Sequence, residues 1–461
     1  MQKILAIAWL TWKAALRFRL FLVIAVLLLA AVVGLPLVLK DDGTARGFTQ
    51  ILITYTLSVI TALLGLSTLW LSCGTLARDI EECQIQVVAT KPVARWQIWL
   101  GKWLGIVSLN ATLLVLSGAC VYGLLQWRAT RLPAAEQEIL RTQVLVARGV
   151  ARPPDYNAEI DARTEQLLEE RLKETHIANA DLPEVRRQLR EQVKAVYQLV
   201  PPQYTREWQI NLGFAKNFLR GQPLQLRVKF NTAQIGLSGT FVGQWRVGEP
   251  GTANVWYSGP MSLSPNAYHE FEIPPDLFDS RGVLTIDFLN ANNTTLLFPI
   301  EDGMAVLYPE GGFTLNFARG LGILFCWMAL LAAIGLASAS FLSFPVATFA
   351  SLALLVVVFS SGTLSDAVAN GTVTGVNEET GTAGHFIADF VLIPAFQGMV
   401  AVINVVKNFS PIDSLSTGRA ISWGELGAAF GQIVLLFGGV ISVIGISLFA
   451  RRELATAQGN Q

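Results

Sequence analysis

Charged residues and histidines are scarce in this sequence. Of its 461 residues only 15% are charged, the formal net charge is zero, and three are histidine. A chain without an excess of one charge has no broad electrostatic field for nucleic acid or an acidic substrate. We therefore expect no nucleic-acid partner. Hydrophobic residues make up 52% of the chain, and they carry most of the information.

The patterns that carry common catalytic chemistry are also missing. There is no GxxxxGK[ST] phosphate loop, no GxSxG nucleophile elbow and no HExxH metal helix. The histidines stand far apart, and the cysteines show neither CxxC spacing nor a disulfide framework. These residues are His176, His269 and His385, and Cys73, Cys83, Cys120 and Cys326. We expect no enzyme active site, no metal site and no cofactor on this chain.

Long apolar runs, by contrast, are frequent near both ends of the chain. About 20 apolar residues in a helix match the hydrocarbon thickness of a bilayer. The first run is longer than the apolar core of a signal peptide, and no small-x-small cleavage site follows it. About six transmembrane helices are expected, at 19–39, 51–73, 103–125, 316–340, 345–363 and 427–449. The sequence therefore predicts an α-helical polytopic membrane protein.

Basic residues suggest how these spans are oriented. Lys3, Lys13, Arg17 and Arg19 precede the first span, which places the N-terminus in the cytoplasm. Six spans then return the C-terminus, with its Arg451–Arg452 pair, to the same side. Residues 1–18 form either an interfacial helix with Trp9 and Trp12 at the headgroups or a simple basic flank.

One apolar segment disturbs this count. Residues 386–407 are long enough to cross but contain Asp389, Pro394, Gln397 and Asn404. A full crossing would make seven spans and put the C-terminal arginines outside. We expect instead a re-entrant or interfacial pair of short helices broken at Pro394, with the full crossing as the alternative.

A large insert, 127–315, separates the two groups of spans and is expected on the extracytoplasmic side. Residues 133–200 are charged and have helical periodicity, which is typical of solvated helix faces. From 205 to 310 the periodicity changes to two, with about seven short strands between turn residues. This pattern predicts an α+β domain, a helical segment followed by a β-sandwich.

Aromatic residues recur in these strands. Alternating aromatics in a sandwich are usually core residues. The alternative is a glycan-stacking surface that includes Trp245, Trp256 and Tyr257.

A charged stretch, 77–102, lies between the second and third spans. A charge at mid-bilayer costs roughly 2.5 to 3.5 kcal/mol, so this stretch belongs in the cytoplasm or at its interface. Trp96, Trp99 and Trp103 recur at helical spacing and would share a face at the headgroup level. The stretch is either an ordinary positive-inside loop or a lever through which a soluble partner moves the spans.

The stretch ARDIEECQIQVVATKPVARWQIWLGKWLG (77–105) resembles the corresponding loop of exporter-type permeases of ATP-binding-cassette transporters. The family run K-P-V-x-R-W-x-I-x-x-G-K-x-x-G is matched by Lys91, Pro92, Val93, Arg95, Trp96, Ile98, Gly101, Lys102 and Gly105. Cys83 and Gln84 depart from the family, which usually has Gly-Thr there. The resemblance implies a coupling loop that docks on an ATPase through Arg78, Asp79, Glu81, Glu82, Lys91, Pro92 and Arg95.

The C-terminal part adds a second resemblance. NFSPIDSLSTGRAIS (408–422) and LFARREL (448–454) resemble permeases grouped with multi-copper enzyme maturation and nitrous oxide reductase assembly. The two resembling parts cover the first 125 residues and roughly the last 145, and the insert lies outside them. They imply a bacterial inner-membrane permease that pairs with a second copy or a related permease and with separate ATPase subunits. The substrate is not implied by any residue.

The last span also carries a small-xxx-small pattern. Gly427 and Gly431 would either pack inside the bundle or form the seam between two permeases.

A different class of function stays open as well. The chain could be a membrane-anchored binding or mechanical module whose outer domain recognises a glycan or a protein without transport.

Overall fold

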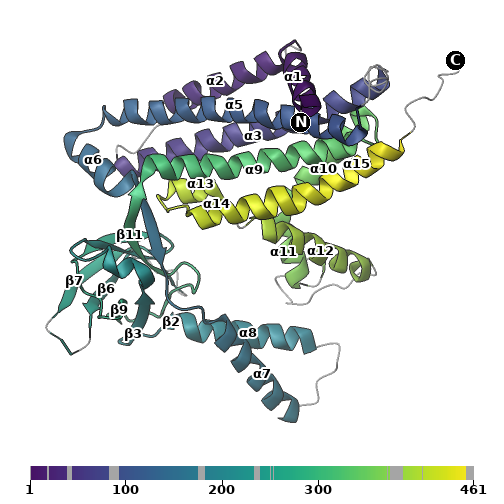
Figure 1. Ribbon diagram of the computed structural model, residues 1–461. Coiled ribbons are helices and arrows are strands. Elements are labelled where there is room, and N and C mark those ends of the chain that lie inside the picture. The colour runs from purple at the N-terminus through teal and green to yellow at the C-terminus, as the bar shows by residue number, and fades with distance from the viewer. Residues whose placement is uncertain are drawn as a thin grey trace. The chain divides into compact units, whose positions relative to one another are not determined.

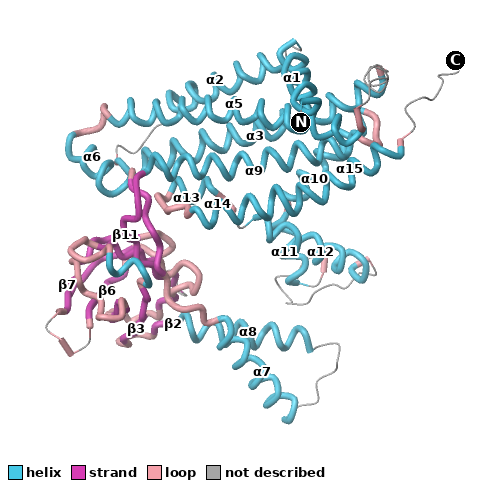
Figure 2. Tube along the Cα trace, in the orientation of Figure 1, coloured by secondary structure: helices cyan, strands magenta, loops and turns pink. Residues whose placement is uncertain are grey.

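Apolar helices and a β-rich insert form two separate units in the computed structural model of the chain (Figures 1 and 2). The helical unit comprises Met1–Ala147 and Gly311–Gln461, and the sheet unit comprises Arg148–Glu310. The structure describes residues 2–17, 20–38, 44–82, 93–174, 182–232, 239–249, 251–252, 254–370, 372–373, 388–407 and 409–452.

The helical unit begins with two helices where the sequence has a basic flank and its first apolar run. Later helices follow the other apolar runs, and the last one contains a π-helical stretch, η3. The helices are α1 (Gln2–Arg17), α2 (Leu20–Val38), α3 (Ala45–Glu81), α5 (Arg95–Ala129), α6 (Ala134–Ile139), η1 (Leu140–Val144), α9 (Phe313–Ala339), α10 (Phe344–Phe359), α11 (Ser361–Asn370), α12 (Asp389–Lys407), α13 (Pro411–Ser416), α14 (Trp423–Ala429), η3 (Phe430–Gly438) and α15 (Gly439–Arg451).

Among the residues that the structure describes, four helical stretches are long and apolar enough to cross a membrane. They are Gly47–Glu81, Arg95–Ala129, Phe313–Ala339 and Trp423–Arg451. Three shorter apolar helices accompany them in the described chain: Val23–Leu35, Phe344–Val358 and Asp389–Ala401. The lengths and composition of these helices are those of a membrane protein.

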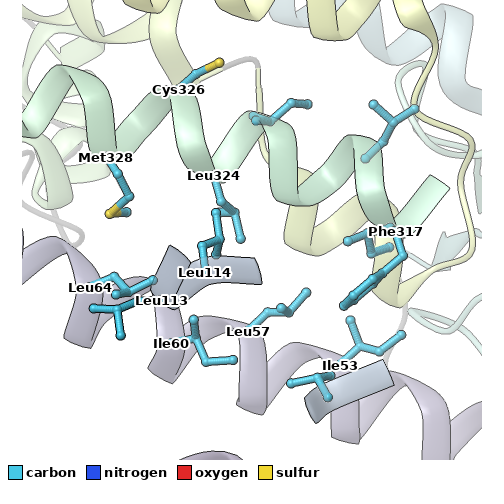
Figure 3. Close-up of a cluster of buried hydrophobic side chains, with 14 of the residues drawn as sticks. Ile53, Leu57, Ile60, Leu64, Leu113, Leu114, Phe317, Leu324, Cys326 and Met328 are labelled. Atoms are coloured by element: carbon cyan, nitrogen blue, oxygen red, sulfur yellow. The ribbon is translucent and has the colours of Figure 1, made fainter. Parts of the chain in front are cut away.

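The core of the helical unit lies among α3, α5 and α9, which pack along one another. Large aliphatic residues of α3 meet leucines of α5 and aromatic and sulfur-containing residues of α9 (Figure 3). Among them Leu57 and Leu64 are fully buried. Helix α9 is the most buried of the four long helices. In its most apolar 18-residue stretch 72% of the residues are buried, against 28% in the last long helix, Trp423–Arg451.

The segment 386–407 does not contain the predicted break. Helix α12 runs without interruption from Asp389 to Lys407, with Pro394 inside it. A proline removes one i→i−4 hydrogen bond, here the bond that would reach the Phe390 carbonyl, and the helix tolerates that loss. The prediction of two short helices separated at Pro394 was therefore wrong.

In its described residues, the sheet unit contains three small sheets and a pair of α-helices. Its strands are β1 (Val146–Ala151), β2 (Leu199–Val200), β3 (Thr205–Asn211), β4 (Leu224–Val228), β5 (Asn231–Thr232), β6 (Phe241–Gly248), β7 (Val255–Leu263), β8 (His269–Ile273), β9 (Val283–Asn290), β10 (Leu296–Leu297) and β11 (Met304–Gly312). The two four-stranded sheets have the orders β1-β11-β4-β8 and β3-β9-β6-β7. A three-stranded sheet has the order β2-β10-β5. A short 3-10 helix, η2 (Gly213–Asn217), follows β3.

One hydrophobic cluster draws on both four-stranded sheets. Ile210 of β3 and Val247 of β6 share it with Leu226 of β4 and Val306 of β11. These residues are the inward members of the alternating patterns in the sequence, because neighbouring strand residues point to opposite faces.

Two helices, α7 (Asn157–Glu174) and α8 (Leu182–Gln198), lie within the segment predicted to be helical. The two helices pack on each other. Their apolar residues Ile160, Leu168, Leu189 and Val193 are buried. The same segment also contains the strand β1, which the helical prediction missed.

Strand β7 forms an edge of its sheet. Its pairing with β6 shifts register between Gln244 and Arg246. Gly259 has a positive φ of 66° at this irregularity, a conformation that favours glycine, and Pro260 follows it opposite Gln244.

Candidate functional site at the charged end of the helical unit

Five helix ends meet where the predicted coupling residues lie. They are the last turns of α3, α9 and α15 and the first turns of α5 and α10, and we call this region the charged end. Polar contacts from Asp79, Glu81, Arg95, Lys102 and Arg452 join these helix ends.

Lys102 and Asp79 join α5 to α3. The Lys102 ammonium lies 2.5 Å from the Asp79 carboxylate and donates a second hydrogen bond, of 2.8 Å, to the Thr75 carbonyl. Lys102 is only 8% exposed, so its charge depends on these two acceptors rather than on water.

Arg95 holds the end of the last helix. Its guanidinium donates to the carbonyl oxygens of Phe449, Ala450 and Arg452, at 3.1, 2.7 and 2.8 Å. The last carbonyls of a helix have no partner within the helix, and the negative end of the helix dipole attracts a cation. Arg95 meets both needs for α15.

Two further contacts extend this network to α9 and α10. Arg452 donates to the carbonyls of Ala339 and Ser340, both at 3.3 Å, where α9 ends. On the α3 side, the Glu81 carboxylate accepts a 2.9 Å hydrogen bond from the Phe344 amide, where α10 begins.

Aromatic contacts support the same junction. The Arg78 guanidinium lies 4.6 Å from the centroid of the Phe344 ring, and Trp70 meets that ring edge-on at 5.4 Å. Three residues of α3, namely Trp70, Arg78 and Glu81, thus contact the first residue of α10.

The two motif glycines let helix α1 lie directly on α5. A Cβ at Gly101 would come within 2.7 Å of the Ile7 Cβ, and one at Gly105 within 2.7 Å of the Thr11 Cβ. Ala8 and Thr11 are buried here, and Trp12 donates a 2.7 Å hydrogen bond to Ser108. Sequence reasoning used these glycines for the resemblance but did not identify their partner.

Not every predicted coupling residue can be placed. Lys91, Pro92, Cys83 and Gln84 lie outside the described residues. Glu82 is exposed at the end of α3. The structure therefore brings Arg78, Asp79, Glu81 and Arg95 together, but in contacts with the chain itself. Lys102 is a member of the site that the resemblance did not assign to coupling.

The tryptophans do not share a headgroup face as expected. Trp96 is exposed, but Trp99 is fully buried and Trp103 donates a 3.0 Å hydrogen bond to the Ala329 carbonyl. Trp99 faces Gly445 of α15, where a Cβ would lie 3.2 Å from its indole nitrogen. The bundle covers two of these rings because α9 and α15 pack against α5.

Gly427 and Gly431 have no close neighbour in the described chain. A Cβ at either position would meet nothing within 4 Å. This stripe therefore does not pack inside the described bundle, and the alternative of a seam with a second chain stays a prediction.

The candidate glycan-stacking residues differ sharply in exposure. Trp245 is 1% exposed, and its ring lies 4.5 Å from that of Phe288, so a sugar ring cannot reach it. Trp256 is half-buried and stacks on Phe271, whereas Tyr257 is 68% exposed. Adjacent strand residues point to opposite faces, so Trp256 and Tyr257 cannot form one stacking surface.

Tyr268, another exposed aromatic residue, belongs to an ionic cluster. Its hydroxyl donates to Asp302 at 2.8 Å, and Lys229 donates to the same carboxylate oxygen at 2.7 Å. Burial and the bond to Asp302 raise the pKa of Tyr268, and the same carboxylate raises the pKa of Lys229. Lys229 also lies 5.0 Å from the Tyr268 ring centroid, so a cation already lies over that ring.

The described residues contain no group of three or more His, Cys, Asp or Glu side chains that could hold a metal ion. Comparisons with protein-family models, curated proteins and solved structures found no match for the chain.

Proposed function

We propose that the chain is the transmembrane permease subunit of an exporter-type ATP-binding-cassette transporter, related to the multi-copper enzyme maturation and nitrous oxide reductase assembly group. A separate ATPase chain would hydrolyse ATP, and a second permease copy or a related permease would complete the transporter. The work would be export, or action on an extracytoplasmic substrate or partner.

One observation carries the proposal. The chain leaves α3 beside Glu81 and enters α5 at Arg95, and these two side chains hold the ends of α10 and α15. A partner that moved these two helix ends would act on four helices at once. This is the arrangement that a permease without its own phosphate loop needs.

We also propose six membrane passages, with both termini in the cytoplasm of a bacterium. Contacts at the other end of the helical unit support an even number of membrane passages. There the Asn316 side chain, near the start of α9, donates a 2.7 Å hydrogen bond to the Arg419 carbonyl and accepts one of 2.7 Å from the Ile421 amide. The chain therefore begins α10 at the charged end and begins α14 at the opposite end. Between these two points it makes a net single crossing from one end of the unit to the other.

We also propose that the sheet unit is a sandwich. The hydrophobic core that the two four-stranded sheets share supports this fold.

Cysteine labelling tests these passages. A cysteine at Asp413, which is exposed, is expected to react with an impermeant maleimide from outside intact spheroplasts. A cysteine at Arg451 is expected to react only after permeabilisation. Ser414, one residue further on, is 4% exposed and is the matched buried control. Labelling of both exposed positions from the same side would contradict the six-passage topology.

Co-purification tests the partner. An ATPase that has a phosphate loop is expected to stay bound to the chain in mild detergent and to be lost when residues 84–90 are exchanged for a Gly/Ser linker. Tyr257→Ala, in the sheet unit, is the control and should retain the ATPase. Native protein that carries no ATPase would contradict the proposal.

The runner-up function is a membrane-anchored binding or mechanical module. The exposed Tyr257 and the charged faces of α7 and α8 favour it, because they offer a surface to a glycan or a protein. Glycan binding by the intact protein that disappears in Tyr257→Ala, without an associated ATPase, would support this alternative.

A further inference from the structure

Two helix ends at the charged end receive their caps from other helices. The residue before α10, Ser343, makes no side-chain capping bond, and the first turn of α10 contains no acidic residue. The Glu81 carboxylate of α3 instead accepts the Phe344 amide hydrogen. An anion at a helix N-terminus satisfies an unpaired amide and matches the positive end of the helix dipole.

The end of α15 mirrors this arrangement with the opposite charge. Helix α15 passes into extended backbone at its C-cap residue Arg452, with φ −68° and ψ 128°. Arg95 of α5 donates to three carbonyls there. Each capping side chain thus carries the charge that its helix end attracts, negative at the N-terminus of α10 and positive at the C-terminus of α15.

These contacts define two pairs of helices. One pair is α3 with α10, joined by Glu81 and by the stacking of Arg78 and Trp70 on Phe344. The other is α5 with α15, joined by Arg95 and by Trp99 beside Gly445. Helix α15 also contacts α9, through Arg452 and through Ala337, which lies next to Gly445. The bond between Lys102 and Asp79 joins the two pairs to each other.

We propose that Glu81 and Arg95 are positioning residues that make α10 move with α3 and α15 move with α5 when the charged end changes shape. The inference rests on the proposed function only for the source of the movement, the ATPase. A shift of either helix end that left its partner behind would break these hydrogen bonds and leave buried polar groups without partners, which favours movement of the two helices together.

Hydrogen exchange tests the caps directly in the full chain in nanodiscs. Arg95→Met is expected to speed exchange at residues 449–452, and Glu81→Ala at Phe344, each by about tenfold, through local opening. Glu81→Gln keeps an acceptor oxygen and should preserve protection at Phe344. Arg451→Ala removes a cation from the same helix end and should leave exchange at 449–452 unchanged, because Arg451 is exposed and forms no hydrogen bond, ion pair or ring contact with the described residues.

A distance measurement tests the coupled movement. Spin labels at Leu104 on α5 and Ser447 on α15 are expected to give one narrow distance that is the same with and without ATP and vanadate. Arg95→Met should widen that distribution and make it depend on the nucleotide, whereas Arg451→Ala should do neither. Unchanged distributions in Arg95→Met, or unchanged exchange in both cap variants, would overturn the proposal.

The same measurements separate this inference from the proposed function. If no ATPase accompanies the chain, the proposed function fails. The exchange rates and the width of the distance distribution then still decide whether the two pairs exist. If the ATPase is present but Arg95→Met leaves the pair intact, only the inference fails.

Discussion

Gly105→Leu is expected to detach helix α1 from α5 and to lower the free energy of unfolding by about 3 kcal/mol, the upper end of typical overpacking costs. A Cβ at this position would lie 2.7 Å from the Thr11 Cβ and 2.9 Å from the Ala8 carbonyl oxygen. The second contact is with backbone, so no side-chain rotation relieves it and α1 must move. Thermal unfolding in nanodiscs and protease cleavage near the N-terminus measure the effect.

Gly123→Leu is the matched control for this substitution. Gly123 lies on the same helix, and a Cβ there would meet nothing within 4 Å. It should therefore unfold like the native chain. Equal destabilisation of both variants would mean that leucine disturbs α5 itself rather than the contact with α1.

Asp79→Ala is expected to destabilise the helical unit by about 1 to 3 kcal/mol, the range for a hydrogen bond to a charged group, because Asp79 is itself 35% exposed and the pair is only partly buried. The Lys102 side chain is 10% exposed, so its ammonium, left with the Thr75 carbonyl alone, cannot recover full hydration in place. Thermal unfolding of the detergent-solubilised protein measures the loss.

The double variant Asp79→Ala/Lys102→Met separates two effects of losing Asp79. One is the cost of a buried ammonium without its carboxylate, and the other is the lost attraction between the two charges. Removing both charges should restore most of the lost stability, because an apolar pair of similar volume needs no partner. A double variant that is as unstable as the sum of the two single changes would show that Lys102 and Asp79 act independently.

The structure also changes how the coupling residues can be tested. The resemblance implies that Glu81, Glu82 and Arg95 face an ATPase, so a variant with all three charges reversed would test docking. Glu81 and Arg95 instead cap α10 and α15. Such a triple variant would disturb the bundle as well as any docking surface, so the single cap variants with their matched controls are more informative.

The sequence predicted those elements whose signal is local. Apolar runs marked the long helices, and alternation marked strands such as β4 and β6, because burial repeats with the period of each structure. Strand β1 was missed since its short stretch VARGVA has no clear alternation and exists through pairing with β11. Its Gly149 leaves room for the Tyr308 ring, a contact between residues far apart in the chain.

The candidate site shows the same limit. The run of charges between two apolar segments drew attention to residues 77–102, but the side-chain contacts there depend on partners from distant segments. Arg95 bonds to residues more than 350 positions away, at the end of α15. Trp99 was expected at the lipid headgroups and is buried against Gly445, a neighbour that spacing within α5 could not reveal.

Strand β7 has a consequence for how the protein behaves when many copies share one membrane. An open strand edge recruits other strands and so leads to aggregation. Pro260 has no amide hydrogen to offer, and the shifted register beside it bends the strand away from a straight template. The β7 edge is thereby protected from edge-to-edge association, so crowding of neighbouring copies should not by itself make this edge a starting point for fibrils.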